Sequence, residues 1–282
     1  MKLSAILAAH VLALLMAAPA ALAEDNPAMS DNTIDLPAPG VQAACEVTLP
    51  LATGDLRAGG GAMALGGANP IDESKTEKVK FLLFMPVDES AKTEDGYPLM
   101  LFLHGAGERG DNLDAVKTHG PPKICEDPER SKTWKFITVS PQVKRGSFWS
   151  PTQLRLLIDL ICEQCPVDRS RIYVTGLSMG GFGTWGMVAH HSDIVAAAAP
   201  ICGGYSLEFA PNMVKTPIWA FHGTDDPAVR YEFSKNLVDA VRAEGNEDVK
   251  FTTYPNAQHD VWTRTYDNPE LYDWFLSKKL EK

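Results

Sequence analysis

Residues 171–181 read RIYVTGLSMGG and place Ser178 at the centre of a G-x-S-x-G pentapeptide. The residues before Gly176 are mostly β-branched or aromatic, as expected of a buried parallel strand. Residues 179–190 are apolar, with small residues and no proline, which favours a helix. A serine on so sharp a strand-to-helix turn is lifted out of the sheet, and the glycines on either side avoid collisions with neighbouring backbone. The pentapeptide is short enough to occur by chance, so its weight depends on partners elsewhere in the chain.

The rest of the chain from about residue 76 alternates between strand-like and helix-like segments. Amphipathic helical patterns occur at 154–163, 233–243 and 269–279. Strand–helix–strand alternation with continuously apolar strands predicts a mostly parallel sheet covered by helices on both faces. Such sheets carry their chemistry at the carboxyl ends of the strands. The strand-like runs are residues 79–85, 99–103, 136–140, 172–175, 195–200, 218–221 and 250–254.

The first 23 residues have the pattern of a secretory signal peptide. Lys2 precedes an apolar stretch from Leu3 to Ala18, and Ala21-Leu22-Ala23 provides a small-x-small cleavage site. The apolar stretch is too short for a lasting transmembrane helix, so no stable membrane anchor is expected. This pattern predicts a periplasmic or secreted protein. Residues 24–76 are rich in Pro, Gly, Asp and Ala, and we expect a partly disordered N-terminal extension with one strand near 45–49, followed by a catalytic domain at 77–282.

Charge and cysteine content narrow the class of protein further. The formal net charge of −10 argues against binding to nucleic acid or to anionic membranes. Five cysteines leave at least one thiol free or paired between chains in an exported protein. Cys162 and Cys165 form a lone C-x-x-C at the end of a helical pattern, so a zinc site or a redox motif is not expected there. We interpret this pair as structural and expect a local or mid-range disulfide.

Ser178 needs a general base and an acid to act as a nucleophile. His259 follows the last strand-like run after a polar loop, where an imidazole can reach the end of a neighbouring strand. The other histidines are more simply explained as part of the leader, as a helix end or as turn residues; these are His10, His104, His119, His190, His191 and His222. Asp225 and Asp226 both follow the strand at 218–221, and Pro227 biases Asp226 to an extended backbone. The chain order Ser178, Asp226, His259 is that of α/β-hydrolases.

An oxyanion hole requires backbone N–H groups that face the nucleophile. The segment 104–110, HGAGERG, follows the strand at 99–103, and its glycines allow such a turn. We expect the donors to be the amides of Met179 and of Ala106 or its neighbour Gly107.

At this point the chain resembles the bacterial "predicted peptidase"/carboxylesterase family of α/β-hydrolases, which is close to feruloyl-esterase-like and polyhydroxybutyrate-depolymerase-like esterases. The resemblance covers nearly everything from residue 77 onward. It implies an α/β-hydrolase fold without a cap domain and a serine hydrolase without cofactor or metal, and its H-G-x-x-D pattern favours Asp226 over Asp225. The matching segments are 101–111 (LFLHGAGERGD), 119–123 (HGPPK), 140–142 (SPQ), 172–185 (IYVTGLSMGGFGTW), 200–204 (PICGG), 218–226 (IWAFHGTDD) and 259–266 (HDVWTRTY).

The sequence therefore predicts an exported carboxylic-ester hydrolase that acts on small-molecule or carbohydrate-linked esters. Its expected triad is Ser178, Asp226 and His259, with Met179 and Ala106 as oxyanion donors. Two alternatives stay open. A serine peptidase would use the same triad, and a non-catalytic binding protein could share the scaffold. Trp149, Trp185 and Tyr205 are candidate pocket walls, although core packing explains each of them as simply.

Overall fold

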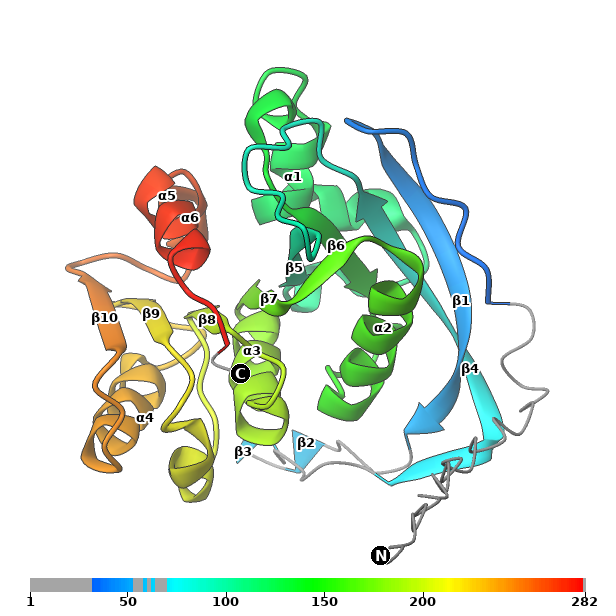
Figure 1. Ribbon diagram of the computed structural model, residues 1–282. Coiled ribbons are helices and arrows are strands. Elements are labelled where there is room, and N and C mark those ends of the chain that lie inside the picture. Colours follow the sequence, from blue (N-terminus) through cyan, green and yellow to red (C-terminus); the bar gives the residue numbers. More distant parts are fainter. Residues whose placement is uncertain (1–31, 53–57, 60–61, 64–69, 281–282) are drawn as a thin grey trace, which may run out of the picture.

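The seven strand-like runs all lie in one sheet of the computed structural model, which describes residues 32–52, 58–59, 62–63 and 70–280. The sheet has eight strands in the order β1-β4-β6-β5-β7-β8-β9-β10 (Figure 1). The pairs from β6 through β10 are parallel, whereas β4 pairs antiparallel with both β1 and β6. These strands are β1 (Gln42–Ala52), β4 (Ile71–Phe84), β5 (Tyr97–Leu103), β6 (Ile137–Gln142), β7 (Val167–Leu177), β8 (Ala197–Ile201), β9 (Ile218–Gly223) and β10 (Val249–Tyr254).

Helices cover both faces of the sheet, as the strand composition predicts (Figure 1). Alternate residues of a strand point to opposite faces, and β5 shows the result. Leu99 and Leu101 join a core with α2, α3 and α4, whereas Met100 and Phe102 join a second core with α1, α5 and α6. The helices are α1 (Gly120–Glu126), α2 (Pro151–Gln164), α3 (Met179–His191), α4 (Tyr231–Ala243), α5 (Trp262–Tyr266) and α6 (Pro269–Leu276). This architecture is the α/β-hydrolase fold.

Short elements complete the described chain. Two-residue strands β2 (Ala58–Gly59) and β3 (Ala62–Met63) pair with each other outside the main sheet. Four 3₁₀ helices occupy the connections: η2 (Ala106–Glu108), η3 (Leu113–Thr118), η4 (Ser131–Thr133) and η5 (Leu207–Met213). In the part of the chain that the structure describes, no helix combines the length and the apolar character needed to cross a bilayer.

The domain boundary expected at residue 77 needs correction. β1 and the first half of β4 precede that boundary, yet both belong to the main sheet, where Val47 pairs with Val79. Residues 32–34 are also held to the domain, because Ile34 N–H donates to the side chain of Gln164 at 2.7 Å. The described residues of the expected extension are thus part of the fold, since β1 covers the edge of β4. The expected signal peptide, residues 1–23, lies outside the described residues.

The disulfide expected at Cys162 and Cys165 is not formed, and all five cysteines are free thiols. Cys165 ends α2 with an extended backbone, and its side chain is buried, whereas Cys162 on the helix is half-buried. Burial raises the pKa of the Cys165 thiol to about 12 and that of Cys162 to about 11. Both groups are therefore protonated thiols near neutral pH, and the C-x-x-C spacing reflects packing at the end of a helix.

Candidate active site

Ser178 occupies the turn between β7 and α3, the strand-to-helix connection expected from the pentapeptide. Its backbone has φ 52° and ψ −117°, a strained combination for a residue with a side chain. A hydrogen bond ties the turn to the neighbouring strand β8: the N–H of Ser178 donates to Ile201 O at 2.9 Å. A Cβ atom at Gly180 would lie 1.8 Å from Leu103 O, and one at Gly176 would lie 2.5 Å from Gly180 O. The neighbouring glycines therefore allow the close approach of three backbone segments.

His259 brings its imidazole to the serine from the loop after β10. Its Nε2 lies 2.9 Å from Ser178 Oγ, and its side chain is 22 % exposed. The ring of Trp262 stands perpendicular to that of His259 with centroids 5.1 Å apart, an edge-to-face contact that restricts the imidazole. The hydrogen bond and the aromatic contact together fix the ring beside the serine hydroxyl.

Asp226 completes a hydrogen-bonded chain behind His259. Its Oδ2 lies 2.7 Å from His259 Nδ1, and its Oδ1 accepts from the N–H groups of Ala228 and Val229 at 2.8 and 2.9 Å. Burial alone would raise the pKa of this carboxyl, but the two N–H donors and the His259 imidazole together hold the pKa below its usual range. Asp225 turns the other way, is exposed, and accepts from the Thr224 hydroxyl at 2.8 Å.

The two expected oxyanion donors lie at the beginnings of helices. Met179 is the first residue of α3, and Ala106 is the first residue of η2. The first N–H groups of a helix have no partner within that helix, so they are available to a substrate oxygen. Because β5 and β7 are adjacent and parallel, the loop after β5 lies beside the turn at Ser178. A Cβ at Gly105 would lie 2.8 Å from the side chain of Leu177, which shows how closely the two segments approach.

Three side chains that the sequence did not single out for this purpose fix the loop after β5. Gln142 at the end of β6 donates its amide to Glu108 O at 2.7 Å and to Asn112 O at 2.9 Å. His104 accepts from Val143 N–H through Nε2 at 3.2 Å and contacts Gly105 O through Nδ1 at 2.6 Å. Burial lowers the pKa of His104 to about 4, so the ring is neutral and donates from Nδ1. Trp149 donates its indole N–H to His104 O at 3.1 Å.

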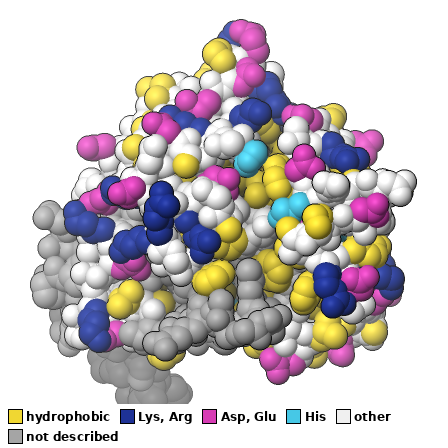
Figure 2. All heavy atoms as spheres, turned by 180° about the vertical axis from the view of Figure 1, so that it is seen from behind, with side chains coloured by type: hydrophobic (Ala, Val, Ile, Leu, Met, Phe, Trp, Pro, Cys, Tyr) yellow, Lys and Arg dark blue, Asp and Glu magenta, His cyan; other side chains and the backbone are white. Residues whose placement is uncertain are grey.

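The approach to His259 contains side chains that the sequence argument treated as turn residues. His119 makes an edge-to-face contact with Trp262 at 5.5 Å, and its Nε2 lies 3.9 Å from Glu108 Oε1. Both side chains remain partly exposed, at 29 % for His119 and 16 % for Glu108. Figure 2 shows histidine side chains beside a hollow lined with hydrophobic groups. The family segment HGPPK was the only feature of the sequence that drew attention to His119. Nothing in the spacing of that segment predicted its contact with Trp262, about 140 residues later.

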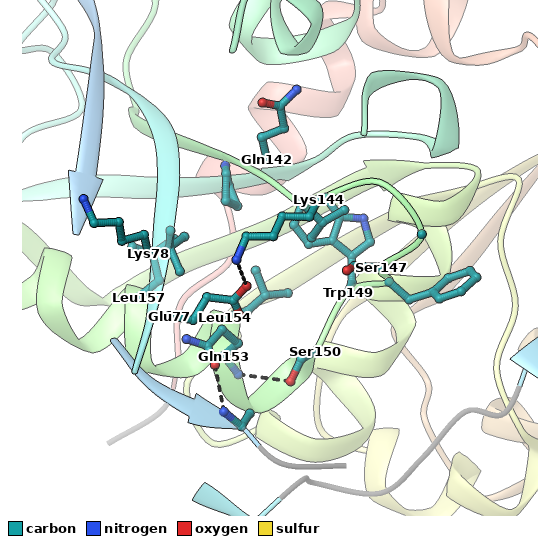
Figure 3. Close-up of a pocket in the computed structure, with 16 residues that line it drawn as sticks. Glu77, Lys78, Gln142, Lys144, Ser147, Trp149, Ser150, Gln153, Leu154 and Leu157 are labelled. Atoms are coloured by element: carbon teal, nitrogen blue, oxygen red, sulfur yellow. Dashed lines mark hydrogen bonds and ion pairs between the residues drawn. The ribbon is translucent and has the colours of Figure 1, made fainter. Parts of the chain in front are cut away.

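A cavity of about 290 Å³ lies between β4, the loop at 143–150 and the start of α2, and Gln142 and Trp149 are among its lining residues (Figure 3). Glu77 and Lys144 point toward each other at 2.6 Å, and Gln153 accepts from Ala52 N–H at 3.1 Å. The three aromatic wall candidates, Trp149, Trp185 and Tyr205, all belong to the buried core, and of these three Trp149 also lines this cavity. Ser178, Asp226 and His259 are not among its lining residues.

Cys202, Asp226 and His259 form a cluster of potential metal ligands, with donor atoms within 4.8 Å of one another. A metal would require a thiolate, an ionised carboxylate and a free imidazole nitrogen. Burial and the neighbouring Asp226 raise the pKa of the Cys202 thiol well above its usual value, and Asp226 and His259 already bond to each other. This donor set fits a hydrogen-bonded network better than a metal centre.

Comparisons with known proteins agree with the fold. The profile of the Dienelactone hydrolase family matches residues 149–270, which include Ser178, Asp226 and His259. The bifunctional acetylxylan esterase/xylanase XynS20E of Neocallimastix patriciarum is 30% identical over 188 residues, covering 63% of this chain and 26% of that protein. Poly(3-hydroxyalkanoate) depolymerase C of Paucimonas lemoignei is 35% identical over 124 residues, covering 38% of this chain and 28% of that protein. The chain thus spans about a quarter of the length of these two relatives.

A solved structure of a thermostable esterase is similar over most of the described domain. It superposes with a TM-score of 0.66 and 29% sequence identity, covering 74% of this chain and 61% of that one. The eight-stranded sheet, the strand-to-helix turn at Ser178 and these matches have one common explanation. The chain has the α/β-hydrolase fold, and it is similar to the Dienelactone hydrolase family over residues 149–270 and to esterases over most of the described domain.

Proposed function

We propose that this protein is an exported serine hydrolase that cleaves carboxylic esters through a Ser178–His259–Asp226 triad. The observation that carries the proposal is the unbroken hydrogen-bonded chain from Ser178 Oγ to His259 and on to Asp226, with separations of 2.9 and 2.7 Å. The same arrangement of nucleophile, base and acid performs acyl transfer on several unrelated folds.

In the proposed reaction, Ser178 Oγ attacks the ester carbonyl carbon while its proton passes to His259 Nε2. Asp226 holds the imidazole with Nε2 toward the serine and stabilises the imidazolium that forms. The amides of Met179 and Ala106 donate to the developing oxyanion. Collapse of the tetrahedral intermediate expels the alcohol, which takes the proton from His259, and leaves Ser178 acylated. Water then attacks the acyl-enzyme, with His259 again accepting a proton, and releases the carboxylic acid.

Two experiments test this proposal. A fluorophosphonate probe should label the wild-type protein at Ser178 and fail to label Ser178→Ala. The same variant should lose turnover of p-nitrophenyl acetate to near background. Labelling without turnover of any ester would indicate an activated serine that acts on another class of substrate, whereas absence of both labelling and turnover would overturn the assignment and favour the binding-protein alternative. Faster turnover of peptide anilides than of esters would identify a peptidase.

The substrate class is proposed from the relatives. One relative is described as an acetylxylan esterase and another as a polyester depolymerase, so esters of carbohydrates and hydroxy acids should be tested first. A panel of acetylated and feruloylated sugars, hydroxyalkanoate oligomers and simple p-nitrophenyl esters would rank them. Export is proposed from residues 1–23 of the sequence, and N-terminal sequencing of secreted or periplasmic material should find a chain trimmed after Ala23.

A further inference from the structure

His222 lies directly behind Asp226. It is at the end of β9, four residues before Asp226, and its side chain is fully buried. Its Nε2 lies 3.2 Å from Asp226 Oδ2, the same oxygen that lies 2.7 Å from His259 Nδ1. One carboxylate oxygen is therefore shared by two imidazole rings, one on each side.

The surroundings of His222 determine where its proton lies. Nε2 is also 2.9 Å from Val229 O, so both neighbours of Nε2 are oxygens that can only accept. A bare Nε2 would place three lone pairs together in a buried site, which is costly. On the other side of the ring, Nδ1 lies 2.7 Å from Ser234 Oγ, and that hydroxyl lies 2.7 Å from Gly203 O. A neutral ring with its hydrogen on Nε2 has a bare Nδ1, which accepts from the Ser234 hydroxyl when that hydroxyl turns its hydrogen from Gly203 O to Nδ1.

We propose that His222 is a positioning residue, resting on the proposed function, whose Nε2–H donates to Asp226 Oδ2 and orients this carboxylate toward His259. The bond gives the carboxylate a fourth donor. Ala228 and Val229 bind Oδ1, and the two imidazoles bind Oδ2. A carboxylate with all four donors cannot rotate without breaking at least one bond, so its oxygen stays in line with His259 Nδ1.

The ionisable neighbours of this pair are few. Cys202, which follows β8, is buried beside Asp226, and its Sγ lies 3.3 Å from His259 O. Tyr231 of α4 makes an edge-to-face contact with the His222 ring at 5.9 Å, and the carboxylate of Glu232 on the same helix lies within electrostatic range of that ring. Burial lowers the pKa of His222, so the ring is neutral near pH 7 and donates from Nε2 alone.

Removing the donor should affect both geometry and charge. The Nε2–H bond partly neutralises the carboxylate, so its loss should strengthen the attraction of Asp226 for a proton on His259. The rising limb of the pH profile of kcat/KM should move to higher pH in His222→Leu. The turnover number should fall about ten- to a hundredfold, while KM for p-nitrophenyl acetate stays within about twofold. His222→Gln, whose side-chain amide can donate near the position of Nε2, should restore most of the turnover number and the wild-type limb.

His190→Leu is the matched control. His190 is also a partly buried histidine bonded to a hydroxyl, Tyr205 Oη at 2.9 Å, but it lies at the far end of α3 from Ser178. The variant His190→Leu removes a comparable polar group, and the pH profile of kcat/KM should stay that of the wild type. A folded His222→Leu variant with the wild-type turnover number and pH limb would overturn the proposal. The proposal would also be overturned if His222→Leu had a lower turnover number but the wild-type pH profile of kcat/KM. That result would show that His222 has a structural role only.

A measurement on the wild-type protein avoids any problem of folding. In a protein labelled with ¹⁵N and ¹³C, the ring ¹⁵N shifts of His222, assigned through bonds from its own backbone amide, should be those of a ring protonated at Nε2 near neutral pH. An unprotonated Nε2 would overturn the proposal even if no variant folds. Ser178→Ala separates the two ideas: an active Ser178→Ala would refute the proposed function and leave the tautomer unaffected, whereas a normal His222→Leu beside an inactive Ser178→Ala would refute this inference alone.

Discussion

Asp226 and its neighbour Asp225 direct their carboxylates to opposite sides of the chain. Asp226 is buried against His259, and Asp225 is exposed against Thr224. Successive side chains of an extended segment diverge in this way, so a shift of one residue in the turn after β9 would exchange their roles.

The first prediction follows from this divergence. Asp226→Asn should lower turnover by about 10⁴-fold, because an amide in place of the carboxylate fixes the wrong imidazole tautomer. Asp225→Asn should lower turnover less than about tenfold, since it changes only a bond to Thr224. Both variants would be assayed on p-nitrophenyl acetate near neutral pH, with folding checked by circular dichroism. Greater loss in the Asp225 variant would require reassignment of the acid.

Ser178 combines a positive φ with a side chain, and this conformation should be measurable as stored strain. Ser178→Gly and Ser178→Ala should both be inactive, but the glycine variant should be more stable than the alanine variant by about 1–3 kcal/mol, the cost of a non-glycine residue in such a conformation. Urea unfolding of the two variants gives this difference directly. Equal stabilities would show that the turn relaxes when the hydroxyl is removed.

Gln142 should affect catalysis without touching substrate. Gln142→Leu removes two hydrogen bonds that fix the loop containing Ala106, so the oxyanion donor should be misplaced and kcat should fall about ten- to a hundredfold. Gln153→Leu is the matched control, because Gln153 lines the same cavity as Gln142 but bonds to Ala52 and not to the loop after β5. Steady-state kinetics of both variants would test this. Similar losses of kcat in both would indicate a general structural effect.

Asp168 and Arg171 form a buried ion pair at 2.6 Å near the start of β7. Asp168→Asn should destabilise the protein by about 3–5 kcal/mol, because it leaves the guanidinium unpaired. Asp193→Asn, which breaks an exposed pair with Arg155, should cost at most about 1 kcal/mol. Chemical denaturation of the three proteins near pH 7 would measure both differences.

The same ion pair predicts a pH dependence of stability. Burial would raise the pKa of Asp168, but hydrogen bonds from Ser170 and Arg171 outweigh this effect and hold it below its usual value. The stabilisation from Asp168 is therefore fully present above about pH 4 and is lost as the pH falls through the lower pKa of the folded state. Thermal melts between about pH 3 and 7 should show a steeper acid loss in the wild type than in Asp168→Asn.

Free thiols at all five cysteines predict that reductant has no effect on stability. The melting temperature with and without a phosphine reductant should agree within error. A thiol-reactive reagent should count five thiols in the denatured protein. A fall in melting temperature on reduction, with fewer than five thiols counted before it, would show that a disulfide forms in the protein.

Much of the fold could be read from the sequence because its signals are local. The apolar runs of β5, of β9 and of the second half of β7 from Ile172 are nearly continuous, and the turn at Ser178 carries its own glycines. β1 was harder to recognise as part of the domain, because only Val47, Leu49 and Pro50 of its eleven residues are buried and the segments around it are rich in glycine and proline. Its place in the sheet depends on pairing with β4, about thirty residues later.

By itself, the sequence determined the strand–turn–helix unit around Ser178 and the chain order of the proposed nucleophile, acid and base, since both depend on local composition and spacing. Only the tertiary structure decided which aspartate faces His259, that His222 shares its oxygen, and that Gln142 holds the loop after β5. The physical reason is the range of the interactions. Hydrogen-bond partners over tens of residues are set by strand order and by backbone direction at loop ends, and neither leaves a periodic trace in the sequence.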